Sequence, residues 1–92
     1  METIQVEPLD GGWAVTTDAT DNPMVFRSGR DAESSARALA ERVARQGEAV
    51  RLQLRLRHSG KTVRMIALPP LTETGTVRLV QLPDAASGAG SD

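Results

Sequence analysis

The sequence predicts an α+β domain in which one amphipathic helix packs on one face of a mainly antiparallel sheet of four or five strands. Three patterns predict it: leucine alternates with polar residues over 50–58, apolar residues recur at helical spacing over 32–44, and further alternating stretches flank glycine-containing turns. A chain of 92 residues has room for one core. We therefore expect a single domain over residues 1–83 and a flexible tail over 84–92.

The first strand and its hairpin partner are predicted at the N-terminus. Ile4 and Val6 alternate with polar residues, and the segment 9–12 then supplies the glycine-rich chemistry of a hairpin loop. A second strand follows the loop. The polar stretch from Thr17 to Pro23 predicts an exposed loop, and the short apolar run at 24–26 either extends the second strand or forms its own.

The helix is predicted between two end signals. Ser28 is placed to cap its N-terminus, and Gly47 is placed to adopt the left-handed conformation just after its C-terminus. Much of the apolar stripe between them is alanine, so the helix can lie close to a sheet, with Leu39 and Val43 as its larger contacts.

The third strand is predicted from Val50 to His58, which reads V-R-L-Q-L-R-L-R-H. Side chains alternate between the two faces of a strand, so one face of this strand is leucine and the other is basic. The leucine face contains Leu52, Leu54 and Leu56, and the basic face contains Arg51, Gln53, Arg55 and Arg57.

A turn at 58–61 leads to a partner strand over 62–68, which ends at two prolines. If alternate residues of this strand face the helix, Ile66 and Leu68 lie on the far face beside the arginines and leave apolar surface to be covered. The stretch from Thr76 to Leu82 is a candidate cover. Its β character allows it to add a fifth strand in the same chain or to pair with another copy.

The net charge of −1 conceals an uneven distribution. Residues 1–26 contain five acids and no base, whereas residues 27–64 contain ten bases and four acids. Such asymmetry indicates either an anionic partner or acidic and basic strands that lie side by side in one sheet, and we favour the second. The absence of cysteine excludes disulfides and thiolate sites, and with no leader or apolar span the sequence predicts a cytoplasmic protein that does not enter a membrane.

Each residue that invites a chemical role has a simpler interpretation. His58 reads as a solvated turn residue rather than a catalytic base, and Asp18 with Asp21 as a loop acid pair rather than a metal site. Trp13 reads as core rather than as a platform for stacking. We therefore expect no enzyme activity, no cofactor and no metal.

A resemblance covers about residues 4–66. The order of a strand, G-G-W-A-V, a strand end at Val25-Phe26, a helix that opens at Asp31-Ala32-Glu33, a further strand, Ser59-Gly60-Lys61 and a last strand resembles a small bacterial family catalogued as domain of unknown function 2188. The resemblance implies a ββαββ-like layout and a small non-enzymatic bacterial or phage domain. It brings no catalytic residues.

Two functions remain open at this point. The first is a non-catalytic interaction module that binds another protein or forms a homodimer, through the outer sheet face or the strand at 76–82. The alternative is sequence-independent binding of nucleic acid through the arginines, although sheet-face RNA binders also need exposed aromatic residues. The candidate interface residues are Arg51, Gln53, Arg55, Arg57, Arg64, Ile66 and Leu68.

Overall fold

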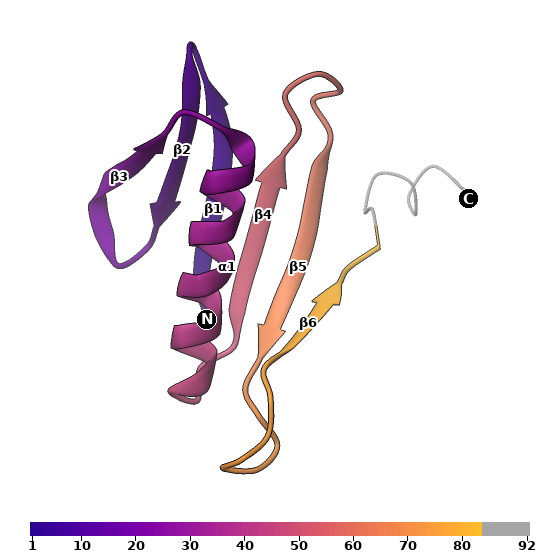
Figure 1. The fold of residues 1–92 in the computed structure, drawn as a ribbon. Coiled ribbons are helices and arrows are strands. Elements are labelled where there is room, and N and C mark those ends of the chain that lie inside the picture. The colour runs from indigo at the N-terminus through magenta and orange to yellow at the C-terminus, as the bar shows by residue number, and fades with distance from the viewer. Residues whose placement is uncertain (84–92) are drawn as a thin grey trace.

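A computed structural model describes residues 1–83, with the side chain of Thr20 left out, and the tail expected over 84–92 lies outside the described residues. Figure 1 shows one helix lying across one face of a single sheet. The elements in chain order are β1 (Glu2–Leu9), β2 (Gly12–Thr17), β3 (Thr20–Phe26), α1 (Gly29–Arg45), β4 (Val50–Arg55), β5 (Thr62–Leu68) and β6 (Arg78–Gln81).

The predicted α+β class is confirmed, but the sheet is larger and less uniform than expected. It has six strands in the order β3-β2-β1-β4-β5-β6, and the pairing of β1 with β4 is parallel while the other pairs are antiparallel. The parallel pair arises because α1 carries the chain from β3 back across the sheet, as such a connection requires. The sheet is therefore mixed.

The expected loop from Thr17 to Pro23 is wrong, because most of it belongs to β3. The connection shrinks to a turn at Asp18 and Ala19, where the Ala19 N–H donates to Thr17 Oγ1 at 3.1 Å. The apolar run at 24–26 thus forms part of a strand of its own. Pro23 is tolerated there because β3 lies at the edge of the sheet, where a missing N–H breaks no ladder on the open side.

Both predicted ends of the helix are confirmed. The Asp31 N–H donates to Ser28 Oγ at 3.1 Å, and Gly47 has a φ of 104° immediately after the cap residue. The four alanines of the inner stripe are completely buried against the sheet: Ala32, Ala36, Ala40 and Ala44. Trp13 also packs partly buried against the core, and its ring lies so near Gly29 that a Cβ there would be 3.0 Å away.

The core lies between α1 and the alternate residues of the central strands. Ile4 and Val6 of β1 pair with Leu52 and Leu54 of β4, and all four side chains are buried. Met65 of β5 is buried beside them. Ala67 of β5 is buried as well, so alternate residues of this strand face the helix.

The predicted strand from Val50 to His58 is too long, because β4 ends at Arg55. Beyond it the chain turns, with the Leu56 N–H donating to Lys61 O at 2.8 Å and the Gly60 N–H donating to Leu56 O at 3.0 Å. Leu56 is 43% exposed, so it does not join the core with the other two leucines. His58 lies in this turn and is exposed, as expected.

The C-terminal strand pairs within its own chain. β6 adds to β5 in antiparallel register, with Ile66 opposite Val80 and Leu68 opposite Arg78. Of the two pairings that the sequence allowed for Thr76 to Leu82, the described structure shows the one within the chain. It covers the edge of β5 rather than the face.

Candidate functional site: the open face of the sheet

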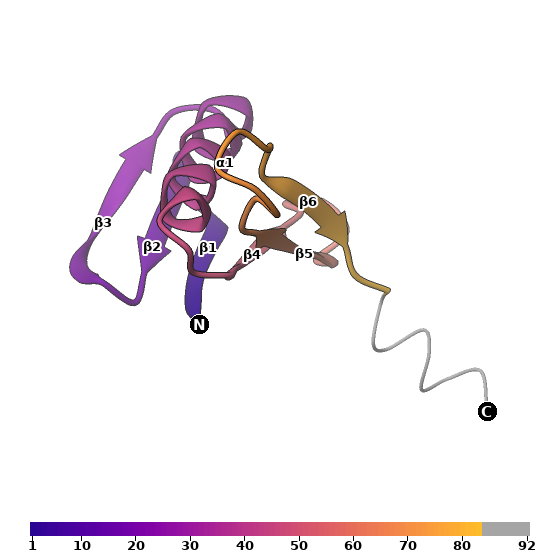
Figure 2. The same ribbon diagram turned by 90° about the horizontal axis from the view of Figure 1, so that it is seen from below.

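One face of the sheet has no layer upon it in the described structure, and we call it the open face. Figure 2 shows α1 and the segment that joins β5 to β6 on the same side of the sheet, so the opposite side is left bare by the described residues. The central open-face residues are those that alternate with the buried ones: Thr3, Gln5, Glu7, Arg51, Gln53, Arg55, Arg64 and Ile66.

A hollow of about 330 Å³ lies on the open face over β4 and β5. Two arginines, Arg51 and Arg64, line it together with apolar residues that include Ile66 and Leu82. The Leu82 N–H donates to Arg64 O at 2.8 Å, which extends the β5–β6 pairing beyond the end of β6 and holds Leu82 at this place. This site, which we call the Ile66 hollow, combines apolar contact with orienting positive charge.

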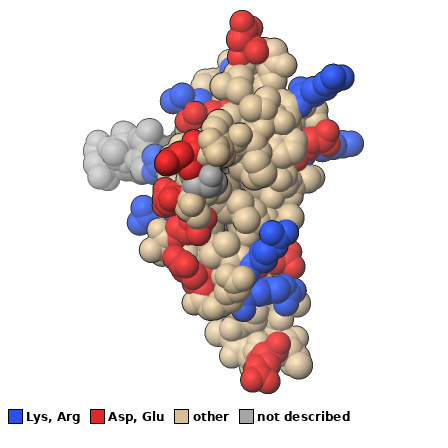
Figure 3. Space-filling model, turned by 90° about the vertical axis from the view of Figure 1, so that its left-hand side faces the viewer, with Lys and Arg blue, Asp and Glu red and all other residues tan. Residues whose placement is uncertain are grey.

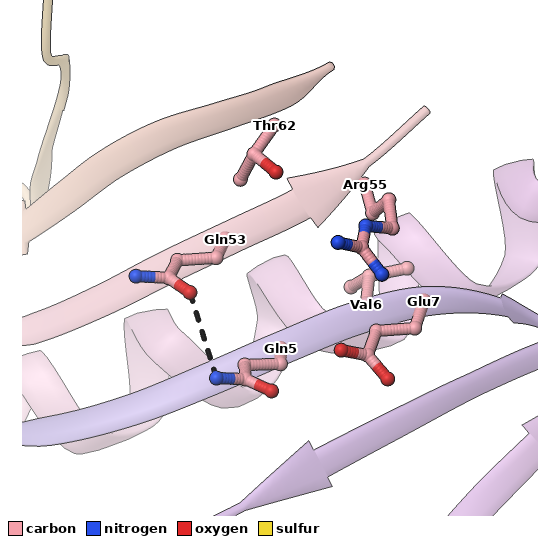
Figure 4. A pocket seen from close by; sticks show the side chains of 6 residues that line it. All are labelled: Gln5, Val6, Glu7, Gln53, Arg55 and Thr62. Atoms are coloured by element: carbon pink, nitrogen blue, oxygen red, sulfur yellow. Dashed lines mark hydrogen bonds between the residues drawn. The ribbon is translucent and has the colours of Figure 1, made fainter. Parts of the chain in front are cut away.

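A second, smaller hollow of about 100 Å³ lies at the boundary between β1 and β4, where the two strands run parallel. Gln5 Nε2 donates to Gln53 Oε1 at 3.5 Å across this boundary. Figure 4 shows the Glu7 and Arg55 side chains on the same side of the sheet beside these two amides. An acidic and a basic side chain from neighbouring strands thus line one hollow, and we call this site the Gln53 hollow.

The structure brings together most of the candidate interface residues. Four of them, Arg51, Gln53, Arg64 and Ile66, line the Ile66 hollow, and Arg55 lines the adjacent Gln53 hollow. Leu68 lies at the end of β5 opposite Arg78, outside both hollows.

Arg57 does not belong to the open face, and its placement there was wrong. Its guanidinium donates to Leu9 O at 3.0 Å and to Gly12 O at 2.6 Å, in the turn between β1 and β2. Its Cζ also lies 5.0 Å from the centroid of the Trp13 ring, within the range of a cation–π contact. Because β4 has already ended, the alternation of faces no longer determines where Arg57 points, and its role is to tie two hairpin ends together.

Two apolar residues of the open face were not assigned to it from the sequence. Val80 is 44% exposed beside Ile66, and Leu82 forms part of the Ile66 hollow. Their alternation with Gln81 was visible, but the face that they occupy follows only from the register with β5. Together with Ile66 they form an apolar strip, defined by these three residues.

The charge of the open face differs between its two halves. The half formed by β1, β2 and β3 has Glu7 in β1, Asp18 in the turn between β2 and β3, and Asp21 near the start of β3. The half formed by β4, β5 and β6 has four arginines: Arg51, Arg55, Arg64 and Arg78. Figure 3, which views the molecule from the β3 side, shows acidic side chains gathered in a column there. The second interpretation of the charge asymmetry, acidic and basic strands side by side, agrees with this arrangement.

The described part of the chain contains no group of three or more histidine, cysteine or acidic side chains that could hold a metal ion. No helix within residues 1–83 is long and apolar enough to cross a membrane. Comparisons with protein-family models, with curated proteins and with solved structures found no match to this chain. The resemblance to domain of unknown function 2188 thus stays a prediction.

Proposed function

We propose that this chain is a non-catalytic interaction module of the cytoplasm that associates with a second copy of itself through the open face of its sheet. The observation that carries the proposal is the open face itself: arginines surround an apolar strip that no described part of the chain covers. Arginine and apolar side chains in this arrangement are typical of protein interfaces, where rim charges orient the partner and apolar contacts stabilise it.

The position of the aromatic residues favours a protein partner over a nucleic acid. Trp13 and Phe26 are the only aromatic residues of the chain, and they pair with each other on the helix side of the sheet. Base stacking on a sheet face requires aromatic residues on that face. The acidic half of the open face would also repel a phosphate backbone.

The size of the open face suits a small dimer. Six strands about 4.8 Å apart and about 20 Å long present on the order of 500 Å² of flat surface. Protruding side chains raise the accessible area above this value, towards the roughly 800 Å² per partner of a standard interface. Most of the open face would therefore have to take part.

Sedimentation measurements on the full chain, from low to high micromolar concentration, test the proposal. We expect the 9.8 kDa chain to sediment as a dimer, and Val80→Glu to shift the protein to monomer by placing a charge in the apolar strip. Leu71→Glu is the matched control, because Leu71 is 81% exposed in the segment on the helix side and its replacement should leave the dimer intact. A strict monomer at the highest concentration would overturn the proposal.

Titration with single- and double-stranded oligonucleotides at low salt tests the alternative that the protein binds nucleic acid. We expect no binding. Binding that weakens with added salt, and weakens again in an Arg51→Ala, Arg55→Ala double variant, would replace the protein partner by a phosphate backbone.

A further inference from the structure

The two halves of the open face are unlike in charge, and the boundary between them is the parallel pair of β1 and β4 at the centre of the sheet. We propose that two copies stack open face to open face about a two-fold axis that runs parallel to the strands between β1 and β4. Glu7 of each copy then lies opposite Arg55 of the other. This inference rests on the proposed self-association and specifies its geometry.

The direction of the two-fold axis determines which strands of the two copies meet. A two-fold axis that lies in the interface along the strands reverses the order of the sheet, so β1 faces β4, β2 faces β5 and β3 faces β6. An axis in the interface but perpendicular to the strands keeps the order, so each strand faces its own copy. Both arrangements keep the strands of the two sheets nearly aligned, which is a common way for sheets to pack.

Charge separates the two arrangements. With the perpendicular axis, the half with Arg51, Arg55, Arg64 and Arg78 would lie against the same half of the second copy. With the axis along the strands, this basic half lies against the half that has Glu7, Asp18 and Asp21. Unlike charges are then brought together in both contacts, and like-charge juxtaposition is costly in an interface.

The register of the sheet gives the height at which residues would meet. In the parallel pair Val6 is level with Leu54, so the next residues, Glu7 and Arg55, share one height. Rotation about an axis along the strands does not change height. It therefore places Glu7 of one copy over Arg55 of the other, and by symmetry the same contact forms twice.

The same rotation brings Val25 of each copy towards the Leu82 end of the apolar strip of the other. Val25 is 66% exposed and lies on the open face, because it pairs with Ala14, which is level with Glu7. The half that contains Val25 comes to lie over the half that contains Leu82. Leu82 pairs with Arg64, which is level with Gln5, so Val25 of one copy lies two residues along the strands from Leu82 of the other. Ile66, level with Thr3, lies farther away.

Reciprocal charge reversal tests the contact between Glu7 and Arg55. Glu7→Arg alone sets arginines face to face twice, and Arg55→Glu alone sets glutamates face to face twice, so each variant should dimerise at least about tenfold more weakly than the original chain. An equal mixture of the two variants restores opposite charges at both contacts. We expect the mixture to form a mixed dimer, detected by fusing a mass tag to one variant.

Mixing also removes the effect of contacts within one chain. Glu7 and Arg55 are neighbours in the same copy, so a single reversal also changes the Gln53 hollow of that copy. Mixing the two variants does not repair this change within either chain. Dimerisation that returns on mixing must therefore come from contacts between the chains.

Cross-linking gives an independent measurement, because the chain has no native cysteine. Thr16 and Arg64 share one height, since both are level with the pair Gln5 and Gln53. With the proposed axis, β2 faces β5, so a Thr16→Cys chain should cross-link to an Arg64→Cys chain and an Arg64→Cys chain should not cross-link to itself. A perpendicular axis that crosses the strands at the height of Gln5 and Gln53 predicts self-linking of Arg64→Cys.

The outcomes of the two proposals can be told apart. If the original chain is monomeric, the proposed function and this inference fail together. If the original chain is a dimer that Val80→Glu disrupts, but the mixed variants stay apart and Arg64→Cys links to itself, the open face is the interface and the proposed axis is wrong.

Discussion

Arg57 should stabilise the fold rather than a complex, and Arg57→Ala tests this. The substitution removes both donors to Leu9 O and Gly12 O and the cation above Trp13. A hydrogen bond contributes about 0.5–1.5 kcal/mol net, and a partly exposed cation–π contact about 0.5–1 kcal/mol. Because Arg57 is itself exposed, we place the expected loss at about 1–3 kcal/mol of the free energy of unfolding.

The assay is urea unfolding followed by both circular dichroism and Trp13 fluorescence. Two probes are needed because the tryptophan lies in the altered contact, and coincident curves show that the loss is global. Arg42→Ala is the matched control, since Arg42 is exposed on α1 and alanine is an equally good helix former. Arg57→Lys should lie between the original chain and Arg57→Ala, because an ammonium group cannot span both carbonyls as a guanidinium does. If Arg57→Ala and Arg42→Ala unfold within about 0.5 kcal/mol of each other, the structural role given to Arg57 is refuted.

Two further predictions concern the helix. Ala40 is completely buried on the side of α1 that faces the sheet, whereas Ala38 is exposed. Ala40→Leu should therefore destabilise the protein by about 1–3 kcal/mol through overpacking, while Ala38→Leu should be close to neutral. Equal unfolding midpoints for the two variants would contradict the close approach of helix and sheet. Ser28→Ala removes the acceptor of the Asp31 N–H and should cost about 1 kcal/mol in thermal or urea unfolding, whereas Ser34→Ala at an exposed helical position should cost nothing. A neutral Ser28→Ala would show that the cap contributes little.

The helix was the easiest part of the structure to predict, because its signals are local. Ser28 and Gly47 mark its ends by the chemistry of a few neighbouring residues, and the alanine spacing marks its buried side. The sequence also predicts that Arg51, Gln53, Arg64 and Ile66 share one face of the sheet. This follows from the alternation of side chains along each strand and from the single hairpin turn that joins the two strands.

The features that were missed depend on contacts between distant residues. The parallel β1–β4 pair follows from the path of the chain through α1 and not from any property of either strand. Arg57 continues the alternation of the sequence, but its acceptors lie 45 and 48 residues away, and these decide its direction. β3 was not predicted as a full strand because it contains Pro23. Proline is unfavourable in a central strand but acceptable in an edge strand such as β3.

The parallel pair at the centre of the sheet has a consequence for the synthesis of the protein. It joins residues 48 positions apart, as in Gln5 and Gln53, so its formation must close a long loop. A nascent chain that has emerged only through residue 49 exposes β1 as an unpaired edge and lacks Val50, Leu52 and Leu54 beneath the helix. The core can therefore be completed only once β4 has left the ribosome, and until then the N-terminal half exposes both this edge and the apolar residues that β4 would cover.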